Sequence, residues 1–183
     1  MSITALALLA LILLMGLSIL WSTLRCGMPP MPSLGRSRQA MLSLLQEAPR
    51  GAIVDMGSGW GTLAVAFARR FPENQVIGYE ISFFPWLFSV FLARVLGLRN
   101  LRFYRLDFRN AQLMGVTALV CYLMPGGMEA IRRRLEAEPG SVEVVISHCF
   151  ALRGWKADDI VEMADLYRTP VYRYCLNQGS HAT

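Results

Sequence analysis

The longest apolar stretch of the chain stands at its beginning. Residues 3–24 contain no charged side chain, and residues 6–15 are apolar without interruption. About twenty such residues span a bilayer as a helix. A cleaved signal peptide is the alternative, but the basic segment that should precede its apolar core is absent and no A-x-A site follows. The pattern therefore predicts a transmembrane anchor over residues 1–26.

The charges after this stretch predict how the chain is oriented. The first arginines, Arg25, Arg36 and Arg38, all follow the apolar residues, and the positive-inside rule places such residues on the cytoplasmic side. We expect a single-pass membrane protein whose remaining chain lies in the cytoplasm. Three prolines in residues 27–36 cannot continue a helix and indicate a short, stiff linker, which leaves residues 37–183 for one domain.

Beyond the linker, short runs rich in Val, Ile and Leu alternate with stretches of helical periodicity. Strands with nearly continuous apolar residues are typical of parallel sheets that helices cover on both faces. We therefore predict an α/β fold with a doubly wound, mostly parallel, Rossmann-like sheet and an abbreviated hairpin at the C-terminus. The predicted strands are 52–55, 75–80, 101–107, 117–123, 142–147 and 170–176, and the predicted helices are 37–48, 62–68, 82–97, 128–137 and a short one that the capping-box pattern 159–162 opens.

The predicted helix 82–97 is unusual because it is apolar on nearly every side. A helix that covers a sheet keeps one polar stripe toward solvent, so we expect the outer side of this helix to meet the bilayer or the anchor. A fully buried core helix is the alternative, and the uncharged part is too short to cross a membrane. Helix 37–48 is expected to cover the sheet edge, and Arg132, Arg133 and Arg134 to form a solvated face or to meet anionic headgroups.

A glycine-rich loop lies between the first strand and the helix that follows it. Residues 55–61 read D-M-G-S-G-W-G, and glycines permit positive φ and remove the Cβ atoms that would hold a ligand away from the backbone. The N–H groups that open the next helix also face this loop. A dinucleotide fingerprint needs a third small residue where this chain has Thr62. The loop therefore predicts a cradle for a different cofactor.

The D-x-G-x-G-x-G spacing resembles motif I of class I S-adenosylmethionine-dependent methyltransferases. Glu80 ends the second strand at the distance where an acid accepts hydrogen bonds from ribose hydroxyls. The resemblance implies that Asp107, at the end of the third strand, binds the adenine amino nitrogen, with Ile81 and Phe108 on the two sides of the ring. A solvated loop position is the alternative for each acid taken alone. The residues expected to bind S-adenosyl-L-methionine are Asp55, Gly57, Ser58, Gly59, Gly61, Glu80, Ile81, Asp107 and Phe108.

Composition favours a membrane as partner and argues against a metal ion. Hydrophobic residues make up 54% of the chain and the mean hydropathy is +0.39, which is high for a soluble domain. The formal charge is +5, and we expect an anionic membrane surface rather than nucleic acid because no basic stripe is interleaved with aromatic residues. The four cysteines and two histidines lack metal-ligand spacing, so we expect no metal ion and reduced thiols.

The order of these features resembles the membrane-anchored lysine methyltransferases that act on the ATP synthase c subunit and the adenine nucleotide translocase. It implies a protein-lysine N-methyltransferase whose substrate is a membrane or membrane-associated protein. A small-molecule or lipid methyltransferase at the membrane and a non-catalytic scaffold of the same fold are the alternatives. The resemblance rests on the N-terminal apolar helix, the proline-containing linker, the loop 55–61, Gly78-Tyr79-Glu80, the aromatic helix that begins near Pro85-Trp86, Asp107-Phe108 and Gly154-Trp155.

The end of the fourth strand departs from the pattern of other methyltransferases. It reads Tyr122-Leu123-Met124-Pro125 instead of the Asn/Asp-Pro-Pro-aromatic set of adenine and glutamine methyltransferases, which argues against a nucleic-acid base or a glutamine as acceptor. A lysine must lose its proton before it accepts a methyl group, and an apolar pocket lowers its pKa. Tyr122, Trp60 and Trp86 are candidates to line such a pocket, with core packing as the alternative for each, and no residue is assigned as the base.

Overall fold

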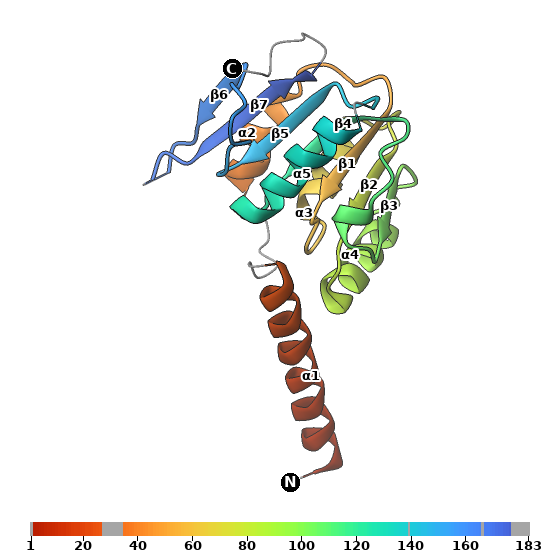
Figure 1. The fold of residues 1–183 in the computed structure, drawn as a ribbon. Coiled ribbons are helices and arrows are strands. Elements are labelled where there is room, and N and C mark those ends of the chain that lie inside the picture. Colours follow the sequence, from red (N-terminus) through yellow and green to blue (C-terminus); the bar gives the residue numbers. More distant parts are fainter. Residues whose placement is uncertain (1, 27–34, 139, 166, 177–183) are drawn as a thin grey trace.

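The computed structural model describes residues 2–26, 35–138, 140–165 and 167–176 (Figure 1). The sheet has the strand order β3-β2-β1-β4-β5-β7-β6. Strands β1 to β5 pair in parallel, and β7 is antiparallel to both β5 and β6. The Rossmann-like, mostly parallel sheet is therefore confirmed. The strands are β1 (Ala52–Met56), β2 (Val76–Tyr79), β3 (Leu101–Tyr104), β4 (Val116–Cys121), β5 (Val144–His148), β6 (Asp159–Glu162) and β7 (Pro170–Cys175).

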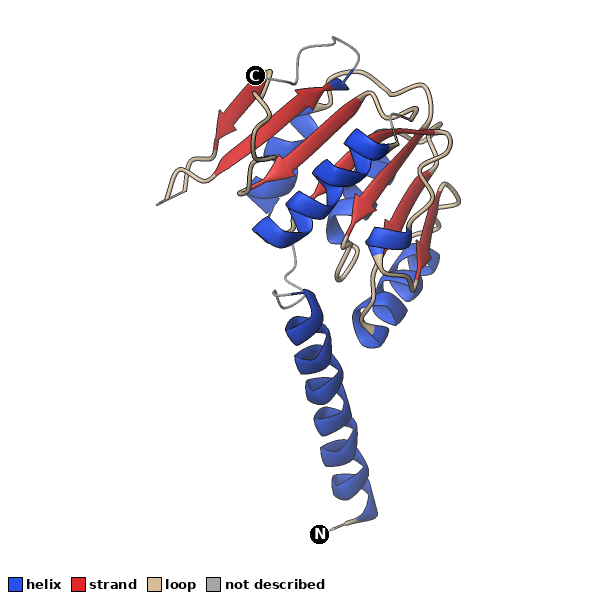
Figure 2. Cartoon of the chain, in the orientation of Figure 1, coloured by secondary structure: helices blue, strands red, loops and turns tan. Residues whose placement is uncertain are grey.

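Helices cover both faces of the sheet (Figure 2). Helices α2, α3 and α4 share one core with side chains such as Ile53 and Ile146, whereas α5 and the 3₁₀ turn η1 share the other core with side chains such as Val54 and Leu119. Alternate residues of one strand thus serve opposite cores, which explains the continuous apolar runs in the sequence. The helices are α1 (Ile3–Cys26), α2 (Gly35–Leu44), α3 (Thr62–Arg70), α4 (Phe83–Val95) and α5 (Pro125–Ala137), and η1 is Phe108–Asn110.

The C-terminal part of the sheet corrects one predicted element. The capping-box pattern 159–162 does not open a helix, because these residues form strand β6 and pair with β7 from Asp159 opposite Arg173 to Glu162 opposite Pro170. The outer edge of β7 would otherwise leave backbone N–H and C=O groups unpaired. The sheet formed by the described residues therefore has seven strands, one more than predicted. The final hairpin ends in β6, which has four residues.

Helix α2 covers the end of the sheet that β6 closes. It packs on β5, β7 and the edge strand β6, and Met41 and Leu44 are buried in the core. The helix begins at Gly35 and ends at Leu44. The predicted linker 27–36 therefore overlaps the helix at residues 35–36, and its residues 27–34 lie outside the described residues.

Helix α1 is 24 residues long and extends away from the domain (Figure 1). Several of its side chains, among them Leu9, Leu13 and Leu17, are exposed, and the helix contacts α4. Within the described ranges, no helix combines the length and the hydropathy that crossing a membrane demands. The transmembrane anchor of residues 1–26 stays a prediction.

Helix α4 is neither fully buried nor polar on its outer side. Its buried residues are Pro85, Ser89 and Ala93, so the interpretation as a fully buried core helix is wrong for its outer side. Several bulky side chains point outward, and the largest exposed fractions belong to Phe91 (62%) and Val95 (63%). A row of large apolar side chains on the surface of a domain marks an interaction site.

Candidate functional site

The candidate site lies at the carboxyl ends of β1, β2 and β3, which meet at one edge of the sheet (Figure 2). Asp55 is the fourth residue of β1, Glu80 follows β2 directly, and Asp107 lies three residues beyond β3. The strand order reverses between β1 and β4. Open α/β sheets bind ligands at this switch point, outside the carboxyl ends of the strands.

The glycine-rich loop is fixed to the end of β2 by backbone hydrogen bonds. The N–H groups of Gly57 and Ser58 both donate to the carbonyl oxygen of Tyr79, at 3.1 and 2.9 Å. Gly57, Gly59 and Gly61 all have positive φ, of 81°, 52° and 75°, a region that residues with a Cβ atom rarely adopt. The loop is therefore a rigid turn whose backbone stays accessible to a ligand.

Glu80 joins this loop to the start of α4. Its Oε2 atom accepts a hydrogen bond from Gly59 N–H at 2.9 Å, and its Oε1 atom accepts one from Ser82 N–H at 2.7 Å. The side chain is buried, with 7% of its surface exposed. Each carboxylate oxygen has a second lone pair, so Glu80 can accept hydrogen bonds from a diol while it keeps both backbone contacts.

Asp55 is a buried carboxyl group with an unused acceptor. Its side chain is 3% exposed, and Oδ2 has no hydrogen-bond partner among the described residues. Burial raises the pKa of Asp55 to about 7, the backbone N–H of Ala64 opposes this rise, and the charge of Glu80 adds to it. The hydroxyl of Ser58 is also buried without a partner among these residues. Unsatisfied buried acceptors beside a glycine loop favour a ligand that carries hydrogen-bond donors.

Asp107 and Phe108 make contacts within the protein that the sequence analysis did not predict. Asp107 caps η1 by accepting a hydrogen bond from Arg109 N–H at 2.9 Å, and it forms an ion pair with the Arg109 side chain at 3.1 Å. The Phe108 ring is buried in the core, with the Arg109 guanidinium 5.2 Å from its centroid. Ile81, by contrast, is partly exposed next to Glu80.

The three candidate acceptor residues have different surroundings. Trp86 donates a hydrogen bond from Nε1 to the carbonyl oxygen of Phe103 at 3.2 Å and packs against the core, so it serves to join α4 to β3. Trp60 is half-buried and meets the ring of Phe88 edge to face, with 5.5 Å between centroids. Tyr122, directly after β4, is half-buried at the carboxyl edge of the sheet.

His148 is a candidate that the sequence analysis considered only as a metal ligand. It is the last residue of β5, 5% exposed, and its ring meets Tyr122 edge to face with 4.4 Å between centroids. Neither ring nitrogen has a hydrogen-bond partner among the described residues. Burial lowers the pKa of His148, and the charge of Asp165 opposes this shift, so the imidazole is neutral near pH 7.

Backbone strain marks the same position. Cys149, which follows His148, has a φ of 71°, and such a conformation in a residue with a side chain often accompanies a functional site. The only signal in the sequence for His148 as a site residue was its position at the end of a predicted strand. Among the described residues, no group of three or more His, Cys, Asp or Glu side chains could hold a metal ion.

Substitution of Gly61 tests whether the loop needs its close packing. A Cβ atom at Gly61 would lie 2.6 Å from Ser89 Cβ and 2.7 Å from Phe103 Cζ, whereas Gly97 has a similar φ of 64° and no atom within 4 Å of the same position. Both alanine variants should lose roughly 1 kcal/mol of stability through backbone strain, and Gly61→Ala a further 1–3 kcal/mol or so through overpacking. Denaturant unfolding measures the difference, and equal losses would contradict it.

Comparisons with known proteins agree with this geometry. Residues 55–159 match a protein family described as the ANTKMT methyltransferase domain. The chain is 30% identical over 160 residues to the lysine N-methyltransferase of the ATP synthase c subunit from Rattus norvegicus, an alignment that covers 85% of this chain and 71% of that protein. It is 29% identical over 136 residues to the corresponding lysine N-methyltransferase from Xenopus laevis, covering 73% of this chain. The chain spans 58% of the length of this Xenopus relative.

A solved structure shares the fold over most of the domain. It is described as an RNA methyltransferase from Salinibacter ruber in complex with S-adenosyl-L-homocysteine. The two structures superpose with a TM-score of 0.70 and 26% sequence identity, which covers 81% of this chain and 95% of the other. The fold of this chain is therefore that of the methyltransferases.

Proposed function

Because this chain belongs to the ANTKMT methyltransferase domain family, we propose that it transfers a methyl group from S-adenosylmethionine to a lysine side chain of a membrane-associated protein. The observation that carries the proposal is the pair of buried carboxyl groups, Asp55 and Glu80, beside a glycine loop at the switch point of the sheet. The names of the relatives, which are lysine N-methyltransferases, support a lysine as acceptor.

The chemistry of the site fits S-adenosylmethionine. The cofactor carries ribose hydroxyls, an ammonium group and a positively charged sulfonium, and the site supplies acceptors in Asp55 Oδ2, the Glu80 carboxylate and the Ser58 hydroxyl. The glycine loop allows a ligand to approach the backbone. Asp55, Glu80 and the loop 57–61 would hold the cofactor, which supplies an activated methyl group when bound.

His148 would prepare the acceptor. A lysine side chain is almost wholly protonated near pH 7, since its reference pKa is about 10.4. The neutral imidazole of His148 has two unpartnered nitrogens, and we propose that one of them takes the proton from the lysine ammonium. Asp165, whose charge raises the His148 pKa, would stabilise the imidazolium that forms. Tyr122 lies against the ring and would form a wall of the acceptor pocket.

Attachment to a membrane would bring the site to its substrate. We propose that residues 1–26 attach the protein to a bilayer and that the domain lies on the cytoplasmic side. The absence of charge in residues 3–24 and the position of Arg25, Arg36 and Arg38 after them support this arrangement.

The full-length protein, incubated with S-adenosylmethionine labelled in the methyl group and a membrane extract, tests this function. We expect label in a protein, at a lysine that mass spectrometry identifies, and no label when the variant Glu80→Ala replaces the wild type. Label in lipid would support the small-molecule or lipid methyltransferase instead, and label in RNA would contradict the proposal. A protein that binds no S-adenosylmethionine in calorimetry would be a scaffold.

A further inference from the structure

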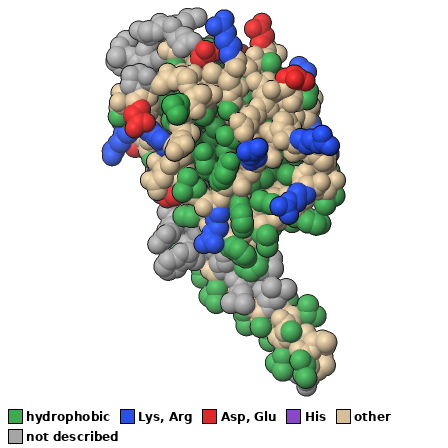
Figure 3. All heavy atoms as spheres, turned by 90° about the vertical axis from the view of Figure 1, so that its right-hand side faces the viewer, with side chains coloured by type: hydrophobic (Ala, Val, Ile, Leu, Met, Phe, Trp, Pro, Cys, Tyr) green, Lys and Arg blue, Asp and Glu red, His purple; other side chains and the backbone are tan. Residues whose placement is uncertain are grey.

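The apolar outer side of helix α4 lies next to exposed arginines of the edge strand β3 and of the turn before it, and this surface is called here the α4–β3 face. Its helix side chains lie at positions i, i+4, i+5, i+8 and i+12 along one side of α4, as in helices that lie in a membrane interface. Figure 3 shows hydrophobic side chains gathered on this side of the molecule, with Lys and Arg side chains around them. The exposed apolar residues of α4 are Phe83, Leu87, Phe88, Phe91 and Val95.

The charge around this face has one sign. Residues 81–106 contain four arginines and no Asp or Glu. Arg94, Arg99 and Arg102 are exposed, and no ion pair within the described ranges involves them. The arginines of α5 differ, because Arg132 and Arg133 pair with Glu129 and Glu136 on the same helix. The positive charge of the α4–β3 face is therefore free to attract an anion.

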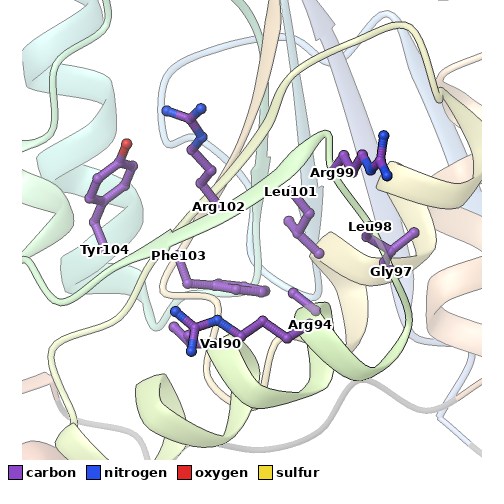
Figure 4. A pocket seen from close by; sticks show the side chains of 10 residues that line it. Val90, Arg94, Gly97, Leu98, Arg99, Leu101, Arg102, Phe103 and Tyr104 are labelled. Carbon is purple, nitrogen blue, oxygen red and sulfur yellow. The ribbon is translucent and has the colours of Figure 1, made fainter.

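A groove of about 470 Å³ lies between α4 and β3, at the arginine-bearing end of this face. Its apolar lining includes Leu101 and Phe103 of β3 and Val90 of α4, and its rim includes Arg94 and Arg102. Figure 4 shows the Leu101 and Phe103 side chains directed from β3 toward α4, with Arg94 and Arg102 on either side of Phe103. Guanidinium groups next to apolar side chains fit a molecule with an anionic head and a hydrocarbon chain.

We propose that the α4–β3 face docks on a bilayer that contains anionic phospholipids. The arginines bind the phosphate groups, and the outer side chains of α4 enter the boundary between headgroups and acyl chains. Nucleic acid would satisfy the arginines but leave Leu87 and Phe91 in water. Helix α1 contacts α4, so the face continues the proposed membrane attachment of residues 1–26. The inference goes beyond methyl transfer and does not depend on it.

Photo-crosslinking with the full-length protein tests this docking. Vesicles carry a photoactivatable phospholipid in phosphatidylcholine alone or with phosphatidylserine, and mass spectrometry locates the crosslinks. We expect crosslinks within 83–95, besides those in α1, that increase when phosphatidylserine is present. Each arginine near an anionic surface contributes a factor of about five in binding. The variant R94E/R99E/R102E should therefore lose at least about tenfold of the α4 crosslinks and keep those of α1.

Matched variants make the result decisive. R50E/R70E/R153E reverses the same number of charges at residues outside this face, and its α4 crosslinks should equal those of the wild type. Phe91→Gln, at an exposed side chain, should also lose α4 crosslinks without disturbing the core. The proposal is overturned by α4 crosslinks no more abundant than those of α5, by equal yields in both kinds of vesicle, or by equal losses in both triple variants.

Discussion

The variant Glu80→Ala is expected to bind S-adenosylmethionine at least about 100-fold more weakly than the wild type. Glu80 accepts hydrogen bonds from Gly59 and Ser82 N–H groups and presents its remaining lone pairs to the site. A hydrogen bond to a charged group contributes roughly 1.5–3 kcal/mol, and two of them correspond to an affinity change of about 100-fold or more. Isothermal titration calorimetry on the full-length protein measures this loss.

A control at a distant acid separates binding from general charge effects. Glu73 is exposed in the loop between α3 and β2, near the opposite edge of the sheet, so Glu73→Ala should leave the affinity within about twofold. If Glu80→Ala retained an affinity within threefold of the wild type, Glu80 would not belong to a cofactor site. Circular dichroism establishes that both variants are folded.

The variant His148→Gln is expected to lower kcat by about 10²–10⁴-fold, which is the usual contribution of a general base. Burial holds the pKa of His148 below its ordinary value, with Asp165 opposing the shift, and Tyr122 and Cys149 are the other titratable groups beside it. The wild-type rate should rise with pH as His148 loses its proton and then level off near neutrality. The affinity for S-adenosylmethionine should stay unchanged, since His148 lies at β5 rather than in the glycine loop.

The shape of the pH profile distinguishes catalysis from packing. Without a base, the rate of His148→Gln should keep rising with pH, because it follows the fraction of free lysine amine. Added imidazole should restore part of the activity of His148→Ala if the ring accepts a proton. A variant whose profile levels off like that of the wild type would show that His148 serves only in packing.

The sequence predicted the cofactor half of the site because its signals are local. The loop 55–61 and Glu80 follow apolar strands directly, and strand order alone brings the two together. His148 could not be found in this way, since its burial and its contact with Tyr122 depend on the pairing of β4 with β5. The prediction of a helix start at 159–162 was wrong for a related reason. These residues form a strand because they pair with the open edge of β7, which the local sequence does not show.

The sequence alone could not predict that Phe108 is buried in the core or that the outer side of α4 is exposed. An aromatic residue after a strand fits both an adenine wall and a core position, and the burial of Phe108 in the core next to Arg109 is visible only in the structure. A helix that is apolar on all sides predicts contact on all sides, but the sequence does not say whether protein or lipid supplies it. In the structure, protein covers only the side that carries Pro85, Ser89 and Ala93.

The buried carboxyl group of Asp55 makes the folded protein sensitive to pH. With a pKa of about 7 against 3.8 for a free aspartate, Asp55 holds a proton in the folded protein that the unfolded chain releases, so its own contribution to stability is fully present below pH 3.8 and is lost as the pH rises to 7. The full difference amounts to roughly 4 kcal/mol. A cationic ligand favours the ionised carboxylate and therefore expels this proton on binding. If Asp55 contacts the methyl donor as proposed, a rise in pH toward 7 lowers the contribution of Asp55 to the stability of the empty protein and raises the affinity for the donor, so the occupancy of the site depends on the proton concentration around it.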